Sequence, residues 1–241
     1  MTMQGVLMLS RVTVRDADFR RVTFDQFAPE GCTFERCDFS GQTLDRRYQP
    51  LFSSRRQSVF RDCTFDGADL TAVRPGQAPF ERCTFVNAKI DSWESFTSEF
   101  IDCTFSGRVV NVRFYGRPWG AGADRLDPAR TVNAFSGNDF RKADLQGVIF
   151  IHGIDILKQR WPDGSQYVIL DRIHQRIAKV RLGVLEWRDH QARQEALDML
   201  QSASLLYAHQ MTIIGRRVEQ RWTATPAVQE RVWEELTAAI A

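Results

Sequence analysis

One motif recurs three times at an interval of 20 residues, and it constrains the fold more than any other feature of the chain. The hexapeptides that begin at Phe60, Phe80 and Phe100 all have the form Phe-x-x-Cys-Thr-Phe. Within and beyond each copy a large apolar residue returns every five positions, which matches neither the period of two of a strand nor the period of 3.6 of a helix. A fixed interval of this length is typical of repeat architectures.

The five-residue period extends over most of the first 150 residues. The large apolar positions include Val14, Phe19, Phe24, Phe34, Phe39, Leu44, Phe60, Phe65, Leu70, Phe80, Phe85, Ile90, Phe100, Phe105, Val110, Phe135, Phe140, Leu145 and Phe150. The position two residues earlier is repeatedly small, as at Cys63, Ala68, Ala78, Cys83, Ala88, Cys103 and Ala143. The repeating unit is therefore small-x-large-x-x.

Several of these units resemble the A(D/N)Lxx signature of pentapeptide-repeat proteins. They are Ala17-Asp-Phe19, Ala68-Asp-Leu70 and Ala143-Asp-Leu145, together with the Cys-Thr-Phe triplets. The resemblance covers about residues 12–150 and implies a right-handed quadrilateral parallel β-helix whose small and large residues point inward. We therefore predict a β-solenoid of about six coils over residues 1–152, a cap or linker over 153–170, and a C-terminal α-helical extension over 171–241.

Stacked coils of a solenoid lie one strand spacing apart, about 4.8 Å. We therefore expect Phe65, Phe85 and Phe105 to form one inner ladder and Cys63, Cys83 and Cys103 to form a ladder beside it. The cysteines, which also include Cys32 and Cys37, lie five, 26 or 20 residues apart rather than at the two-to-four-residue gaps of a zinc site. Interior packing is the favoured role for them, and we expect no metal or other cofactor.

The repeat fails mainly at one side of the predicted coil. Residues 45–57 make one coil six residues too long, and the stretch between Val110 and Phe135 has an excess of 15. Loops on one face of a repeat rod usually carry the binding surface. The candidate partner-binding residues in these two loops are Arg46, Arg47, Tyr48, Arg55, Arg56, Arg113, Tyr115, Arg117 and Trp119. The alternative is a solvated loop whose arginines pair with neighbouring carboxylates.

A helical period replaces the five-residue period after Asp171. Ile173, Ile177, Val180 and Val184 predict a helix to about Trp187, Asp189 can cap a second helix, and Thr225-Pro226 can begin a third. The second helix is expected to extend over about 34 residues. Its apolar stripe, which would cap the rod or dimerise with a second subunit, includes Leu200, Tyr207, Met211, Ile214, Val218 and Trp222.

Composition and motifs argue for a binding protein rather than an enzyme. The chain has 241 residues and a net charge of +2, and its four histidines are scattered. It contains no phosphate-binding glycine loop, HExxH or GxSxG motif that would assemble a nucleophile, base and stabiliser. No signal peptide or membrane span is visible, so the cytoplasm is the expected location. We expect a non-enzymatic scaffold that presents its loop-bearing face to a macromolecular partner.

Two alternatives remain for the partner. The family resemblance implies protection of a type II topoisomerase such as gyrase from poisons, through a rod that imitates duplex DNA. The first 150 residues carry 20 basic and 19 acidic side chains, so such mimicry would require the acidic ones to gather on one face. The second alternative is nucleic-acid binding through the arginine-rich loop 45–57, whose arginines alternate with aromatic residues.

Overall fold

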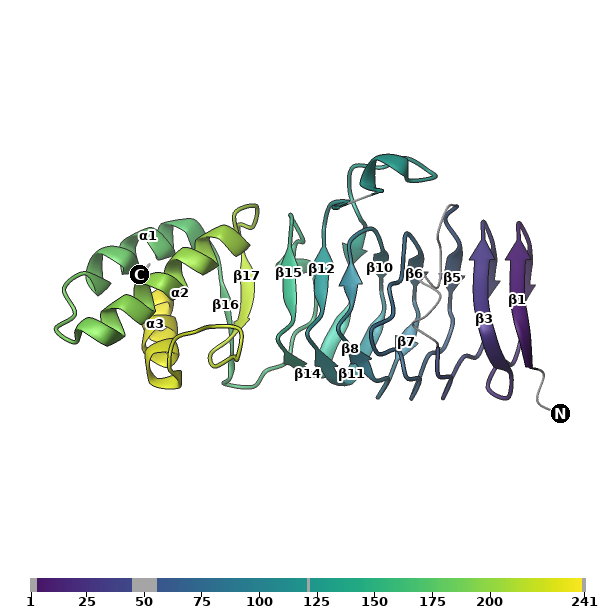
Figure 1. Ribbon diagram of the computed structural model, residues 1–241, viewed down its shortest axis with the longest axis horizontal. Coiled ribbons are helices and arrows are strands. Elements are labelled where there is room, and N and C mark those ends of the chain that lie inside the picture. The colour runs from purple at the N-terminus through teal and green to yellow at the C-terminus, as the bar shows by residue number, and fades with distance from the viewer. Residues whose placement is uncertain (1–3, 45–55, 121, 240–241) are drawn as a thin grey trace.

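The computed structural model of the chain describes residues 4–44, 56–120 and 122–239. Figure 1 shows an elongated molecule in which the N-terminal part is a rod of short strands lying side by side, and the helices gather at the C-terminal end. Among the described residues, no helix is both long enough and apolar enough to cross a membrane.

The rod consists of short strands that pair in parallel with the equivalent strands of the neighbouring repeats. One side of the rod is formed by β2 (Thr13–Arg15), β4 (Thr33–Glu35), β5 (Val59–Arg61), β6 (Pro79–Glu81), β10 (Glu99–Ile101) and β13 (Phe135–Ser136). The remaining sides contain β1 (Gln4–Ser10), β3 (Thr23–Glu30), β7 (Thr84–Phe85), β8 (Ile90–Asp91), β9 (Glu94–Ser95), β11 (Thr104–Val110), β12 (Arg113–Tyr115), β14 (Asp139–Gln146) and β15 (Ile149–Ile151). Single 3₁₀ turns occur at η1 (Ala123–Arg125) and η2 (Ile156–Lys158).

The strand register follows the 20-residue interval of the sequence. Phe60 lies opposite Phe80, which lies opposite Phe100. The same side keeps its register across the two irregular repeats, because Phe34 pairs with Phe60 and Phe100 with Phe135. The extra residues of these repeats therefore do not shift the register of the strands on this side. Parallel β-structure followed by helices, a β-helix-like arrangement, is thus confirmed.

Two ladders of phenylalanine rings fill the interior. In the first, Phe65 stacks on Phe85 with ring centroids 5.1 Å apart, and Phe85 stacks on Phe105 at 4.9 Å. All three rings are fully buried, so the predicted inner ladder is confirmed. The ladder continues at both ends; its members are Phe19, Phe39, Phe65, Phe85, Phe105, Phe140 and Trp161. The second ladder consists of Phe34, Phe60, Phe80 and Phe100.

The cysteines lie in the interior beside the rings, as the packing interpretation requires. Cys63, Cys83 and Cys103 are at most 1% exposed. Each thiol donates to a carbonyl oxygen of the preceding coil, at 3.5 Å from Cys63 to Phe34 and at 3.2 Å from Cys103 to Phe80. Burial raises the pKa of the Cys83 thiol, which keeps it protonated. These side chains act as small core residues with weak hydrogen bonds.

The segment after β15 closes the C-terminal end of the rod. Trp161 lies in the predicted cap, outside the five-residue period, and its indole ring stacks on Phe140 at 5.2 Å to form the last step of the first ladder. Its Nε1 donates to the carbonyl oxygen of Ile156 at 2.7 Å, which satisfies the polar edge of the ring. The last coil is therefore covered by an aromatic side chain of the same chain.

The tail contains α1 (Ile173–Val184), α2 (His190–Leu206) and α3 (Pro226–Ala238). The Asp189 side chain caps α2 by accepting hydrogen bonds from the backbone N–H groups of Gln191 and Ala192. Thr225 is the residue before α3, whose first position is Pro226. The first and third helices and the cap at Asp189 thus agree with the sequence prediction.

The prediction of one helix of about 34 residues after Asp189 is wrong. Helix α2 ends at Leu206, and the chain turns back into strand β17 (Ile213–Arg216), which pairs antiparallel with β16 (Tyr167–Leu170). The β-branched pair Ile213 and Ile214, followed by Gly215, has low helix propensity, and β16 offers an edge that needs a partner.

The residues proposed as a dimerisation or capping stripe do not share one helix face. Leu200, Tyr207, Ile214 and Trp222 are buried within the chain, whereas Met211 is 70% exposed and Val218 is 37% exposed. Leu200, Tyr207 and Trp222 join a core that also includes Ile149 and Ile151 of the last rod strand, whereas Ile214 packs into the core of the rod itself. This core attaches the tail to the rod; dimerisation through the two exposed members stays a prediction.

Candidate functional site

The long loop at 116–134 is fastened to the rod by buried hydrogen bonds. Asn133 is 2% exposed, and its amide nitrogen donates to the carbonyl oxygens of Phe96 at 3.0 Å and Tyr115 at 2.9 Å. At the start of the loop, a Cβ atom on Gly116 would lie only 2.7 Å from the backbone nitrogen of Ile154. Only glycine allows the two backbones to approach this closely. Both ends of the loop are therefore held in place.

A buried ion pair fastens the same loop from the other side. Arg130 and Glu99 have side chains only 12% and 14% exposed, with Nε 3.6 Å from the carboxylate. The Arg130 guanidinium also donates to the carbonyl oxygen of Thr97. Burial lowers the pKa of Arg130, and the Glu99 carboxylate opposes this change. The loop is thus an ordered excursion from the rod, apart from residue 121, which lies outside the described residues.

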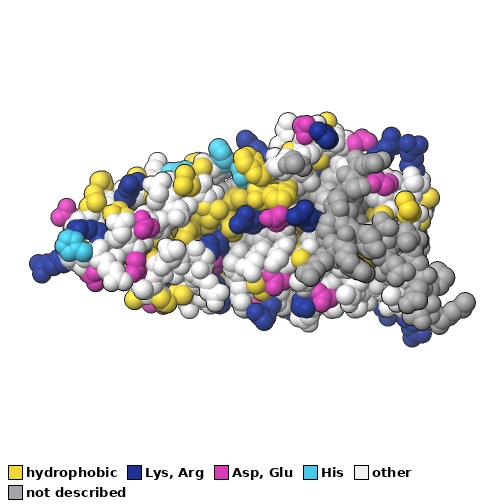
Figure 2. Space-filling model, in the orientation of Figure 1, with side chains coloured by type: hydrophobic (Ala, Val, Ile, Leu, Met, Phe, Trp, Pro, Cys, Tyr) yellow, Lys and Arg dark blue, Asp and Glu magenta, His cyan; other side chains and the backbone are white. Residues whose placement is uncertain are grey.

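The loop places Trp119 in a surface cluster that we call the aromatic patch, formed by Phe96, Tyr115, Trp119, His152 and His209. The rings are in contact in series: Phe96 and Tyr115 at 4.9 Å between centroids, Tyr115 and His152 at 5.3 Å, and Trp119 and His152 at 4.5 Å. His209, from the turn after α2, lies 5.4 Å from His152. In Figure 2, hydrophobic side chains gather on the viewed face between the rod and the tail, with histidines at their edge.

Within the patch, Trp119 differs from its neighbours in exposure. It is 52% exposed, whereas Tyr115 is 5% exposed. The backbone N–H of Trp119 donates to the carbonyl oxygen of Phe96 at 3.2 Å, so the exposed indole stands on a fixed backbone. A large, half-exposed ring on a rigid support is the kind of side chain that anchors protein interfaces.

His152 forms the centre of the patch and links the rod to the tail. Its backbone is left-handed, with φ of 56°, and the next residue, Gly153, donates its N–H to the buried Gln210 side chain at 2.6 Å. Gln210 in turn donates to the carbonyl oxygen of Ile154 at 2.9 Å. Burial lowers the pKa of His152, and His209 and Arg117 lower it further by charge repulsion.

The structure brings only part of the predicted site together. Tyr115 and Trp119 meet in the patch, and Arg117 is close enough to His152 to lower its pKa. Arg56 lies elsewhere, with Nε 3.4 Å from Asp127, so at this position the predicted pairing of a loop arginine with a carboxylate is observed. The remaining candidates, Arg46, Arg47, Tyr48 and Arg55, lie outside the described residues.

Arg113 points to a different surface from Trp119. It lines a groove of about 810 Å³ between the rod and the tail, together with Arg216, Arg221 and Glu219. Glu219 is 5% exposed at its side chain and forms an ion pair with Arg221. Burial raises the pKa of the Glu219 carboxyl, although Arg221 opposes the change. The groove is therefore polar, and the Glu219 carboxylate neutralises the charge of one of its arginines, Arg221.

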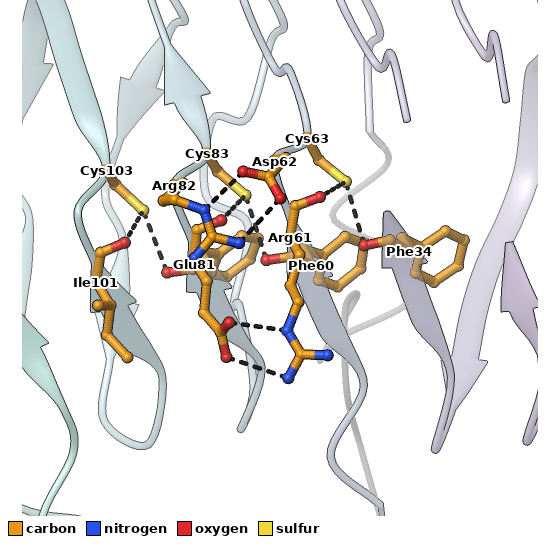
Figure 3. A network of polar contacts seen from close by, with 11 residues as sticks. Phe34, Phe60, Arg61, Asp62, Cys63, Glu81, Arg82, Cys83, Ile101 and Cys103 are labelled. Atoms are coloured by element: carbon orange, nitrogen blue, oxygen red, sulfur yellow. Dashed lines mark hydrogen bonds and ion pairs between the residues drawn. The ribbon is translucent and has the colours of Figure 1, made fainter. Parts of the chain in front are cut away.

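The charges on the rod alternate from coil to coil. Arg61 pairs with Glu81 at 2.8 Å, and in the adjacent column Arg82 pairs with Asp62 at 2.7 Å; Figure 3 shows both pairs beside the thiol contacts. The Arg82 guanidinium donates to the Asp62 carboxylate and lowers its pKa. The same alternation occurs in the pairs Arg15–Glu35, Asp16–Arg36 and Asp69–Lys89. These columns mix the two signs and give no continuous row of carboxylates.

Sequence reasoning missed Phe96, His152 and His209. Phe96 lies in a repeat that lacks the five-residue signature, and the histidines are 57 positions apart in the sequence. No local signal could have joined His209 to the rod, because their contact depends on the turn after α2. Within residues 4–44, 56–120 and 122–239, no group of three or more His, Cys, Asp or Glu side chains is placed to hold a metal ion.

Of three comparisons with known proteins, the one with solved structures found similar chains. No protein-family model matches the chain, and no curated protein matches it. Among solved structures, two trypsin-treated variants of QnrB1, described as a plasmid-mediated fluoroquinolone resistance protein, are similar. The first is 14% identical and covers 76% of this chain and 96% of that chain, with a TM-score of 0.25. The second is 14% identical and covers 67% and 79%, with a TM-score of 0.21.

Proposed function

We propose that this protein is a non-enzymatic scaffold that binds a protein partner through the aromatic patch. The observation that carries the proposal is Trp119: it is 52% exposed, contacts His152, and is fixed by a backbone hydrogen bond to Phe96. Tryptophan and tyrosine are enriched among the residues that dominate binding free energy at interfaces. Because the rod and the fastened loop hold the patch in position, little conformational entropy would be lost on binding.

We also propose that the rod belongs to the pentapeptide-repeat family and is a right-handed four-sided β-helix of about six coils. Support comes from the burial pattern of single repeat units. In the pairs Cys63 and Phe65, Ala68 and Leu70, and Cys83 and Phe85, both the small and the large residue are at most 1% exposed. The 20-residue register between Phe60, Phe80 and Phe100 is the interval that four such units require.

A type II topoisomerase is the partner class that the sequence resemblance implies. Imitation of DNA by charge alone is disfavoured, because the ion-pair columns of the described rod alternate in sign. If the partner is a topoisomerase, we propose that the contact is made by the aromatic patch and the neighbouring Arg117. Binding of a topoisomerase at the aromatic patch should have a binding free energy that depends on Trp119 and only weakly on salt concentration.

Site-specific photo-crosslinking tests the scaffold proposal. A photoreactive amino acid in place of Trp119 should give a discrete crosslinked product in cells. The same amino acid in place of Leu182, which is 69% exposed on α1, should not. Equal labelling at the two positions, or none at position 119, would contradict a binding role for the patch.

A supercoiling assay tests whether the partner is a type II topoisomerase. Supercoiling by gyrase is measured with a fluoroquinolone and a stoichiometric excess of the protein. The wild type and Leu182→Ala should restore supercoiling, and Trp119→Ala should not. No protection by the wild type removes gyrase as the partner without removing the scaffold proposal. Retention on DNA that falls steeply between about 50 and 200 mM salt would instead favour nucleic-acid binding.

A further inference from the structure

The two ends of the rod differ in how the terminal coil is covered. The C-terminal end is covered by Trp161 and by the tail, whereas β1 is the last labelled strand at the N-terminal end in Figure 1, and β2 is the last strand of its sheet. Among the described residues, β1 pairs only with β3 and β2 pairs only with β4. Both are edge strands, with backbone N–H and C=O groups directed away from the rod.

The interior of the first coil is also incompletely covered. Leu9, Val14, Ala17 and Phe19 are only partly buried, while the corresponding rings of the next coil, Phe34 and Phe39, are 0% exposed. On the same end, Met8 is 74% exposed and Val12 is 40% exposed. Apolar side chains next to unpaired strand edges form a surface that favours association with further β-structure.

The shape of this surface restricts what can cover it. An extended peptide would pair with one side of the coil only, as in ordinary strand addition. The edge groups lie on more than one side, because β1 and β2 occupy different sides of the rod. Another rod end with the same outline presents backbone edges on more than one side at once, so a second copy of this chain is the occupant with the matching shape.

Charge supplies the second argument for a second copy. In the middle of the rod, an acidic side chain such as Asp62 lies between two arginines, Arg36 and Arg82, that both lower its pKa. At the N-terminal end this alternation stops: Arg15 pairs with Glu35 at 2.6 Å on the side of the next coil, and Asp18 pairs with Arg20 at 2.8 Å. An added layer would continue the alternation if it placed a carboxylate next to Arg15.

We propose that two copies associate end to end through their N-terminal coils, about a twofold axis at the corner between Arg15 and Asp18. This axis makes β2 antiparallel to the segment around Phe19 of the second copy. It sets Val14 against Phe19 and Arg15 against Asp18, and each contact occurs twice by symmetry. The apolar interior then continues through the interface, and the column of alternating charges gains its next member.

The size of the contact predicts a reversible dimer. Five residues of strand span about 16 Å, so the flat end of a four-sided coil has an area of roughly 270 Å². Even with allowance for side chains, this is less than the about 800 Å² per partner of standard stable interfaces. The dimer is therefore expected to dissociate on dilution, and its dissociation constant is measurable by sedimentation velocity over a range of concentrations.

Charge exchange tests the axis with the full-length protein. Arg15→Asp and Asp18→Arg should each weaken the dimer by about tenfold or more, because both symmetric contacts become repulsive. The double exchange should restore association. Arg61→Asp, in the same column but in the middle of the rod, should leave association unchanged. These side chains are largely exposed, so folding should tolerate the changes, and the melting temperature of each variant verifies this.

Each outcome decides the proposal. Association that is lost in the single variants and regained in the double variant supports it, as does concentration-dependent protection of the Thr13–Arg15 amides from hydrogen exchange. A protein that stays monomeric into the millimolar range overturns it. Association that ignores Arg15 and Asp18 but is lost in Met211→Glu, on the exposed part of the tail, also overturns it and identifies a tail dimer instead. None of these results bears on binding at Trp119.

Discussion

The middle of the rod and its junction with the tail are stabilised in different ways. In the middle, every coil repeats the same contacts, and Phe65, Phe85 and Phe105 stack at nearly constant distance. At the junction each contact occurs once: Gln210 holds Gly153 and Ile154, and His152 meets His209. The repeated region spreads its stability over many equivalent interactions, whereas the junction depends on a few single residues that are specific to this chain.

The largest effect is expected in the repeated region. Phe85→Ala removes a fully buried ring with neighbours above and below, and should lower the free energy of unfolding by about 3 to 5 kcal/mol. Denaturant unfolding measures this loss. Phe96→Ala, a half-buried ring in the patch, is the matched control and should cost clearly less. An unchanged midpoint for Phe85→Ala would contradict the ladder as the core of the rod.

The next largest effect is expected at the junction. Gln210→Ala leaves the N–H of Gly153 and the buried carbonyl oxygen of Ile154 without their partner, and the buried carbonyl oxygen makes the expected cost about 1 to 3 kcal/mol. Hydrogen exchange should then quicken in the tail and around residue 153 but not at Phe65 or Phe85. The exposed Gln201→Ala serves as the control. Uniform quickening along the whole rod would show that the junction and the rod unfold as one unit.

Acidification should weaken the junction selectively. Because the pKa of His152 is lowered in the folded protein, the unfolded chain binds its proton first, and stability falls as the pH drops below about 6.5. Above that pH, His152 is neutral in both states and contributes no pH dependence. His152→Asn keeps a residue that tolerates the left-handed backbone and should flatten the decline in melting temperature between about pH 7 and 5. An equally steep decline in this variant would assign the effect to other groups.

The smallest effect is expected on the flank of the rod. Arg61→Gln removes an ion pair with Glu81 that is 40% and 23% exposed at the two side chains. Exposed pairs contribute about 0 to 1 kcal/mol, so the midpoint of unfolding should hardly move. A double-mutant cycle with Glu81→Gln isolates the pair. A coupling free energy well above 1 kcal/mol would mean that the ion-pair columns act cooperatively along the rod.

This difference between the regions also explains what the sequence could predict. The ladder of Phe65, Phe85 and Phe105 and the interior cysteines follow from a period that a reader can see, because each coil places equivalent residues in equivalent surroundings. The sequence does not indicate that Trp161 continues the ladder, because Trp161 lies outside the five-residue period. The helix after Asp189 was predicted too long because the apolar spacing of 207–222 fits a helix. The low helix propensity of Ile213-Ile214-Gly215 is a weak local signal, and the edge of β16 that favours a strand there is present only in the tertiary structure.

The candidate site was predictable in part for the same reason. Loop lengths that break the 20-residue interval pointed to Tyr115 and Trp119, which lie in the patch. Arg113, which was predicted in this loop, lies in strand β12 and lines the groove instead, because Phe114 is the buried residue of that strand and the groove is formed only when the tail folds back. Phe96, His152 and His209 could not be grouped, since they meet only through tertiary structure.

Because Phe60, Phe80 and Phe100 keep a constant register, each 20-residue unit adds the same length to the rod. Deleting or duplicating one 20-residue unit in this region would change the distance between the N-terminal end and the aromatic patch by one strand spacing, about 4.8 Å. Neither end would change its chemistry, because the new coil would meet the same neighbours as the old one. Duplication of a repeat can thus adjust the distance between the N-terminal end and the aromatic patch in steps of fixed size, while both surfaces stay as they are.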